Sequence, residues 1–170
     1  DLVAAYLDHF HVCTINGSSN DLFGKGSNAR IGTNKPAGFW QPMVDQINKE
    51  NKTNHKRIQY GGSGDTRKAL LAGEVDYVFL STRHTYKLEK AGATCFAEFT
   101  DSKKIKYENT VNELSAGKNK FDSSFATGWS LFNADKKMVN KMRKEIRGLF
   151  QTNDSNIIKA LGGSTPINYY

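Results

Sequence analysis

Short apolar runs alternate with amphipathic runs over the first hundred residues. Five runs rich in β-branched and aromatic residues predict strands. They cover residues 9–15, 29–32, 55–60, 75–80 and 94–99. Apolar residues three and four positions apart predict helices between these strands. They cover residues 39–51, 65–72 and 82–91. This order of strands and helices is typical of right-handed βαβ units, so we predict an α/β domain with a mostly parallel sheet and flanking helices.

Other segments interrupt or follow this alternation. The polar stretch 16–28, which holds three glycines and three serines, predicts a loop. After residue 100 we expect a short helix or turn at 110–114, a strand at 125–132, a long helix at 136–151 and a last helix at 154–161. We expect the apolar side of the long helix to pack on the sheet. That side carries Met138, Met142, Ile146, Leu149 and Phe150.

The chain has 170 residues, of which 38% are hydrophobic and 24% charged, as in an ordinary folded domain. Residues 1–100 hold 12 Lys/Arg and 10 Asp/Glu, whereas residues 101–170 hold 12 and 7, within a net charge of +7. The simpler interpretation of this excess of positive charge is a solvated helix face, and the alternative is an acidic ligand, a partner or a nucleic acid. Aromatic residues do not interleave with the basic ones, which argues against nucleic acid. An apolar run long enough for membrane insertion is missing from the sequence.

Two cysteines, Cys13 and Cys95, fit neither a metal-binding spacing nor a CxxC motif. Both lie in predicted strands. Buried free thiols are the simpler interpretation. A disulfide is the alternative, and it would imply an oxidising compartment.

Three loops follow predicted strands and precede predicted helices. In an open α/β sheet, ligands bind outside the carboxyl ends of the strands, where helix N-termini offer backbone N–H groups to anions. Glycines let the backbone approach a ligand closely, and hydroxyls add hydrogen bonds. The alternative is that these are ordinary turn and cap residues. The candidate ligand-binding residues are Thr33, Asn34, Tyr60, Gly61, Gly62, Ser63, Gly64, Ser81 and Thr82.

Motifs of catalysis are missing from these loops. The run Gly61 to Asp65 is neither a GxSxG nucleophile elbow nor a phosphate-binding P-loop. The histidines form no HExxH motif; His9 and His11 share a strand face, but histidines at such positions are more often structural than metal ligands. We therefore expect no catalytic residues, no metal and no cofactor.

One segment resembles a known family. Residues 58–79 read IQYGGSGDTRKALLAGEVDYVF, in which a strand ending in Tyr meets a glycine-rich turn and then a helix reading Ala-Leu-Leu-x-Gly-x-Val-Asp. This run resembles the signature of the TctC/Bug-like solute-binding proteins of tricarboxylate transporters. Weaker similarities lie at residues 16–19, 110–114 and 128–132. The chain resembles this family over nearly its whole length but lacks most of the first lobe.

The resemblance implies a fold of the type II periplasmic-binding-protein kind. It implies one unit over residues 1–170, with a ligand-gripping lobe at about 16–100 and C-terminal strand and helices at 101–170. The implied function is extracytoplasmic binding of a small di- or tricarboxylate for a membrane transporter, without catalysis. The alternative is a binding-protein lobe used as a structural or interaction module in a larger assembly, such as a virion or surface complex. The resemblance also implies that Cys13 and Cys95 lie on neighbouring lobe-crossing strands.

Overall fold

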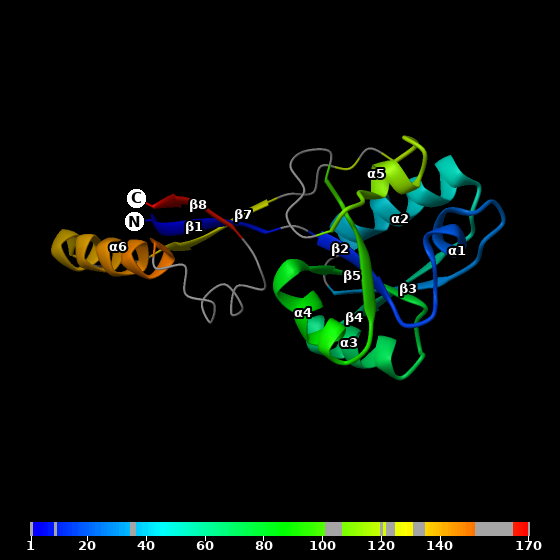
Figure 1. Cartoon of the computed structure of the whole chain (residues 1–170), viewed down its shortest axis with the longest axis horizontal. Helices are drawn as coiled ribbons and strands as arrows, with labels where there is room; N and C mark the ends of the chain where they lie inside the picture. Colours follow the sequence, from blue (N-terminus) through cyan, green and yellow to red (C-terminus); the bar gives the residue numbers. More distant parts are fainter. Residues whose placement is uncertain are drawn as a thin grey trace.

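The computed structural model describes most of the chain. The described residues are 2–8, 10–34, 37–100, 107–119, 121, 125–130, 135–151 and 165–169. They form two sheets, one of five strands and one of three (Figure 1).

The five-stranded sheet has the order β4-β3-β5-β2-β6. Its strands are β2 (Phe10–Thr14), β3 (Arg30–Asn34), β4 (Lys56–Tyr60), β5 (Tyr77–Ser81) and β6 (Thr94–Glu98). Strand β3 pairs in parallel with β4 and β5, whereas β2 pairs antiparallel with both β5 and β6. Four strands therefore run the same way and β2 runs against them, which makes the predicted sheet a mixed one.

Helices cover both faces of this sheet (Figure 1). On one face, α1 (Ser19–Phe23), α2 (Ala37–Asn51) and α5 (Val111–Leu114) bury a core that includes Trp40 and Phe79. On the other face, α3 (Ser63–Leu71) and α4 (Thr82–Lys90) bury Leu70 and Leu88 against the sheet. Burial of apolar side chains on both faces stabilises the sheet, because each removes apolar surface from water.

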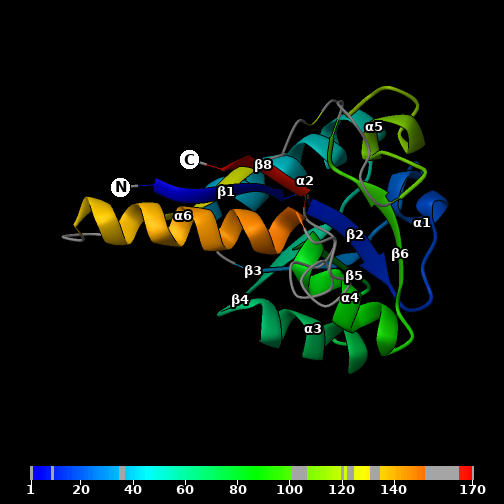
Figure 2. The ribbon, with the colours of Figure 1, turned by 60° about the vertical axis from the view of Figure 1, so that its left-hand side comes forward.

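The second sheet joins segments that are far apart in the sequence. Strand β1 (Leu2–Asp8) lies between β7 (Phe125–Ser130) and β8 (Thr165–Tyr169) and pairs antiparallel with both. Helix α6 (Lys136–Gln151) runs alongside β1 and contacts β1 and β8 (Figures 1 and 2). Strand β7 and helix α6 were predicted from the sequence, whereas β1 and β8 were not.

The face of α6 that points toward the small sheet differs from the predicted one. Val139 is 2% exposed, and Arg143 and Ile146 are half-buried, so this i, i+4, i+7 stripe faces inward. Met138 and Met142 are 52% and 37% exposed, so the prediction that they pack on the sheet is wrong. Ile146 lies on both the predicted and the observed face, so the helix is turned from the predicted orientation by less than the roughly 100° that separates neighbouring residues. The side chains of Leu149 and Phe150 lie outside the described residues.

Cys13 and Cys95 face each other across β2 and β6 and form a disulfide, with their Cα atoms 4.0 Å apart. The prediction of neighbouring strands is confirmed, and the simpler interpretation as free thiols is wrong. The two residues are 82 positions apart in the sequence. Only the pairing of β2 with β6 decides that they meet.

The predicted strands and helices of residues 9–99 are confirmed, with small shifts of their ends. The loop predicted at 16–28 is wrong at 19–23, where α1 forms behind a capping box. There the Ser18 hydroxyl accepts from the Asp21 N–H, and the Asp21 carboxylate accepts from the Ser18 N–H. The helix predicted at 154–161 lies outside the described residues.

Candidate functional site

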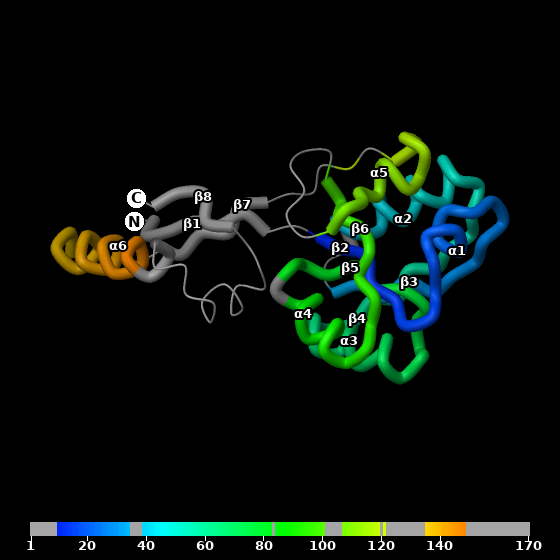
Figure 3. The backbone as a smooth tube through the Cα atoms, viewed as in Figure 1, coloured from blue at the N-terminus to red at the C-terminus, as the bar shows by residue number. Residues whose placement is uncertain are grey.

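The three predicted loops lie at one edge of the five-stranded sheet. Strands β3, β4 and β5 are parallel, so their carboxyl ends, at Asn34, Tyr60 and Ser81, share that edge. Helices α3 and α4 begin there and run side by side (Figure 3). The structure therefore brings the candidate residues of all three loops to one edge, which we call the carboxyl edge.

The glycine-rich turn before α3 is open. Gly62 is the N-cap, with an extended backbone (φ −167°), and a Cβ atom built on it would meet no atom within 4 Å. Asn34 Nδ2 donates to Ser63 Oγ at 2.8 Å, which ties the end of β3 to the first turn of α3. The Thr66 hydroxyl donates to the Gly62 carbonyl at 3.0 Å. These bonds hold the turn in place while its outer side stays accessible.

Helices α3 and α4 differ from α1 and α5 at their first residues. In α1 and α5, Ser18 and Thr110 form capping boxes with Asp21 and Glu113. At Gly62, before α3, and at Ser81, before α4, no side chain makes a capping hydrogen bond. The first N–H groups of a helix have no partner within the helix, and a cap normally accepts from one of them. At the carboxyl edge this acceptor can come from a ligand.

Two candidate side chains are engaged elsewhere. The Tyr60 hydroxyl donates to Glu74 Oε2 at 3.3 Å, beyond the last turn of α3 and so away from Gly62. Burial and the Glu74 carboxylate raise the pKa of Tyr60. Thr33 is fully buried, and its hydroxyl accepts from Arg57 Nη1 at 3.0 Å. The side chains of Tyr60 and Thr33 therefore support the carboxyl edge through hydrogen bonds within the protein.

The start of α4 is more closed than the start of α3. Ser81 is 5% exposed and Thr82 is fully buried. The Thr82 carbonyl accepts from the Thr85 hydroxyl at 2.9 Å. The candidate residues most open to a ligand are therefore Gly61, Gly62, Ser63 and Gly64.

Three charged or titratable residues near this turn were not among the candidates predicted from the sequence. Arg67, one turn after Ser63, contacts His84 of α4, with Arg67 Nη1 3.2 Å from His84 Nδ1. Arginine only donates, so Nδ1 accepts and the His84 ring is neutral in this contact. Asp65 is exposed in the first turn of α3. The available signal for Arg67 was its position four residues after Ser63, because residues four apart lie on the same face of a helix.

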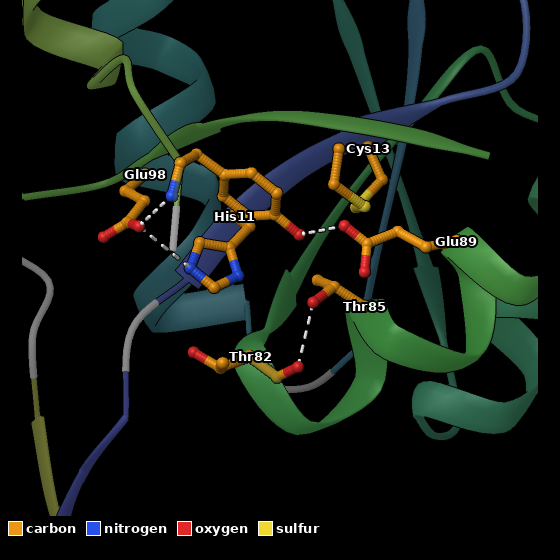
Figure 4. Close-up of a disulfide and its surroundings, with 8 residues drawn as sticks. His11, Cys13, Thr82, Thr85, Glu89 and Glu98 are labelled. Atoms are coloured by element: carbon orange, nitrogen blue, oxygen red, sulfur yellow. Dashed lines mark hydrogen bonds and ion pairs between the residues drawn. A yellow bond between two sulfur atoms is a disulfide. The ribbon is translucent and has the colours of Figure 1, made fainter. Parts of the chain in front are cut away.

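A buried polar cluster lies between the disulfide and the start of α4 at Thr82 (Figure 4). His11 and Glu98 are both fully buried, with Nε2 4.0 Å from Oε1. Glu98 Oε1 accepts from the Tyr107 N–H at 2.7 Å, and the Tyr107 hydroxyl donates to Glu89 Oε1 at 2.7 Å. Burial raises the pKa of Tyr107. These hydrogen bonds hold the chain at Tyr107 against the domain, and His11 is a buried residue of the same cluster. His9 lies outside the described residues.

A cavity of about 680 Å³ lies at the opposite edge of the sheet, where β3 and β5 begin. Its lining includes Asp21, Tyr77 and Asp76. Arg30 already neutralises Asp76 at 2.9 Å and donates to the Gly73 carbonyl at the end of α3. Cavity size alone points to this amino edge, but its acidic side chains already have partners within the chain: Asp76 pairs with Arg30, and Asp21 accepts from Ser18. The carboxyl edge is the better candidate because its helix ends lack side-chain caps.

Two features are missing from the part of the chain that the structure describes. Its His, Cys, Asp and Glu residues form no group of three or more that could hold a metal ion. None of its helices is both long and apolar enough to span a membrane.

Comparisons with known proteins show the fold. No family model and no curated protein matches the sequence. The structure is similar to an R. palustris protein with adipate, at 14% identity and a TM-score of 0.69, covering 97% of this chain and 58% of that one. It is also similar to a TctC solute-binding protein from Polaromonas, at 14% identity and a TM-score of 0.63, covering 99% and 63%. An ancestral cationic amino acid solute-binding protein is similar at 9% identity and a TM-score of 0.61, and the match covers 96% of this chain and 62% of that one.

The mixed five-stranded sheet with its flanking helices therefore has the fold seen in the lobes of periplasmic binding proteins. Two of these three neighbours are solute-binding proteins, and all three are at low sequence identity. The chain spans between 58% and 63% of their length.

Proposed function

We propose that the chain binds a small organic carboxylate at the carboxyl edge, as part of an extracytoplasmic solute receptor without catalytic activity. The observation that carries this proposal is the start of α3. A glycine-rich turn with open space beside Gly62 leads into a helix that has no side-chain cap. The positive end of the helix dipole and its N–H groups favour an anion at that position.

The residues of the turn supply the contacts. A carboxylate over Gly62 would accept hydrogen bonds from backbone N–H groups of the first turn and from the hydroxyl of Ser63. Hydrogen bonds to a charged acceptor are roughly twice as strong as neutral ones. Arg67, one turn further along α3, adds positive charge next to the site. Asn34 keeps Ser63 in position through the 2.8 Å bond.

An apolar side chain at the same edge supports an organic ligand. Phe39, in the first turn of α2, is 40% exposed, and its ring centroid lies 5.0 Å from that of Phe10. An exposed aromatic ring can cover the hydrocarbon part of a ligand whose charged end is held by amides. A dicarboxylate with a short carbon chain fits this chemistry. The similar protein with adipate supports the same ligand class.

The wider role rests on the resemblance and on the neighbours. As a receptor, the protein would sit outside the cytoplasm and present its ligand to a membrane transporter, without inserting into the membrane. The alternative role is a binding-protein lobe used as an interaction module in a larger assembly. Binding of a carboxylate by the purified chain would favour the receptor role, and a lack of binding would favour the interaction module.

The test is a calorimetric titration with adipate, malate and citrate, with thermal shift as a second readout, because a ligand of the native state raises its stability. We expect Gly62→Val to abolish binding without unfolding the protein, since its Cβ meets open space and φ −167° is accessible to any residue. Gly148→Val is the matched control, because Gly148 also has open space but lies on α6. Unchanged affinity in Gly62→Val would contradict the proposal.

Asp65 favours a second ligand class. Its carboxylate is exposed in the first turn of α3, where it repels an anion and attracts a cation. A cationic amino acid combines a carboxylate for the turn with a positive side chain for Asp65, and one similar structure is a binding protein of that kind. Asp65→Asn distinguishes the two ligands. It should tighten adipate binding several-fold if the site takes dicarboxylates, and weaken arginine binding if it takes cationic amino acids.

A further inference from the structure

The exposed side of α6 combines positive charge with uncovered apolar surface. Residues 135–147 carry six Lys/Arg and two Asp/Glu. Lys137, Lys141 and Lys144 are exposed and follow one another at i, i+4 and i+7, so they form a row along the helix. Met138 and Met142 form a second exposed row beside them. We call these five residues the Met–Lys face.

The exposure of the two methionines is unusual for this protein. The large hydrophobic residues that are exposed within the described ranges are Phe39, Leu71, Met138 and Met142. Two of these four lie one turn apart on α6, next to the lysine row. The inward stripe through Val139 and Ile146 already packs toward β1 and β8. The small sheet therefore covers only part of the apolar side of α6.

We infer that the Met–Lys face docks an acidic segment of a partner protein, one that places apolar side chains between rows of Asp or Glu. Charge complementarity identifies the partner, since the lysine row needs carboxylates and the only acid on the helix itself is Glu145. The methionines identify the apolar contact, because their flexible thioether side chains pack well on irregular surfaces.

The same features favour a protein over a lipid surface. A helix that lies in a membrane interface buries a continuous apolar face, typically rich in Trp, Phe and Leu. Among the described side chains of α6, Val139 and Ile146 are turned toward the small sheet, and the two exposed methionines lie on one flank. That apolar area suits a few inserted side chains of a partner and is small for a bilayer.

The probe is a synthetic helical peptide with a pair of leucines one turn apart between two rows of glutamates. We expect fluorescence anisotropy to show binding that weakens on the order of tenfold between about 50 and 300 mM sodium chloride, because surface charges are screened over a Debye length. The triple variant Lys137→Glu, Lys141→Glu, Lys144→Glu should lose at least about tenfold in affinity. Met138→Ser with Met142→Ser should lose several-fold at both salt concentrations.

The matched control reverses three exposed lysines elsewhere, at Lys25, Lys49 and Lys118. It has the same net charge as the α6 triple variant and should retain wild-type affinity within about twofold. Circular dichroism checks that each variant keeps its helix content. An equal loss in the control would show that net charge alone attracts the peptide, and would overturn the proposal.

Three other results would also overturn it. One is equal binding of a peptide with serines in place of the leucines, since the methionines would then contribute nothing. Another is tighter binding to vesicles of phosphatidylglycerol and phosphatidylcholine than to the peptide, which would indicate a membrane surface. The third is self-association at low salt that the α6 triple variant abolishes, which would make a second copy the partner.

Discussion

The two edges of the five-stranded sheet are built in opposite ways. At the amino edge, polar groups bond to one another: Thr14 Oγ1 donates to the Asp76 carbonyl at 2.7 Å, and the Tyr77 hydroxyl donates to the Ser18 carbonyl at 2.8 Å. Burial raises the pKa of Tyr77 to about 12, so this hydroxyl stays protonated as a donor. At the carboxyl edge, the turn at Gly62 leaves helix amides without a side-chain cap.

The difference separates residues that stabilise the fold from residues that are available for binding. Both edges carry glycines, hydroxyls and helix ends, so residue type alone does not distinguish them. What distinguishes them is whether each polar group already has a partner within the chain, because a buried polar group without a partner destabilises the fold. Substitutions at the amino edge should therefore change stability, and those at the carboxyl edge should change ligand binding.

The disulfide offers the largest test of this separation. It joins β2 to β6, outside the three parallel strands that carry the candidate loops. Replacing Cys13 and Cys95 by serine should cost about 2–5 kcal/mol of unfolding free energy, measured by denaturant titration. Carboxylate affinity below the unfolding midpoint should stay the same. A loss of affinity in a folded variant would show that the sheet transmits strain from β2 to the carboxyl edge.

Glycine substitutions compare the edges directly. A Cβ atom on Gly17 would lie 2.3 Å from the Tyr77 hydroxyl oxygen and 2.8 Å from Thr14 Oγ1, inside a bonded network. We expect Gly17→Ala to cost about 1–3 kcal/mol, as is usual for overpacking. Gly62→Ala, with open space around it, should cost less than about 0.5 kcal/mol. Equal losses in thermal denaturation would remove the contrast between the edges.

His55 should make the stability of the protein near the amino edge decrease at acidic pH. Its Nδ1 accepts from the Ala29 N–H at 3.0 Å and its Nε2 lies 2.6 Å from the Leu22 carbonyl oxygen, which requires a neutral ring. Burial lowers the pKa of His55 below 6.5. As the pH falls through about 6.5, the unfolded chain therefore binds a proton that the folded chain does not, and stability declines.

The measurement is the melting temperature between about pH 8 and pH 5. We expect the wild-type protein to lose stability below about pH 6.5 and His55→Gln to lose less over the same range, since glutamine does not titrate. The variant should be less stable than wild type at neutral pH because its side chain cannot make both ring contacts. A pH profile identical to that of wild type would assign the acid sensitivity to another group.

The smallest effect is expected at Tyr60. Its hydroxyl contacts an exposed glutamate at 3.3 Å, so Tyr60→Phe should cost about 0.5 kcal/mol. Adipate affinity, measured by calorimetry, should not change, because the hydroxyl points away from Gly62. A several-fold loss would place the hydroxyl in the ligand site and extend the binding surface along α3.

Periodicity predicted the order of strands and helices from residue 9 to residue 99, because each element carries its own apolar stripe or run. The candidate loops could be found for the same reason: the end of a strand and the start of a helix are local features. The run at residues 58–79 also indicated the binding-protein fold that the similar structures show. The ligand-binding role of the nine candidate residues stays a prediction.

Tertiary structure decided what depends on contacts between distant segments. Strands β1 and β8 pair with each other although they lie at opposite ends of the sequence, so no local pattern indicated their sheet. The register of β2 and β6 decided that Cys13 and Cys95 form a bridge. Packing of α6 on the small sheet decided that Val139 and not Met138 points inward. The sequence did not decide this, because a helix with a wide apolar side can rotate with little change in buried area. Local sequence determines which elements form, whereas the free energy of packing between them selects their partners and their faces.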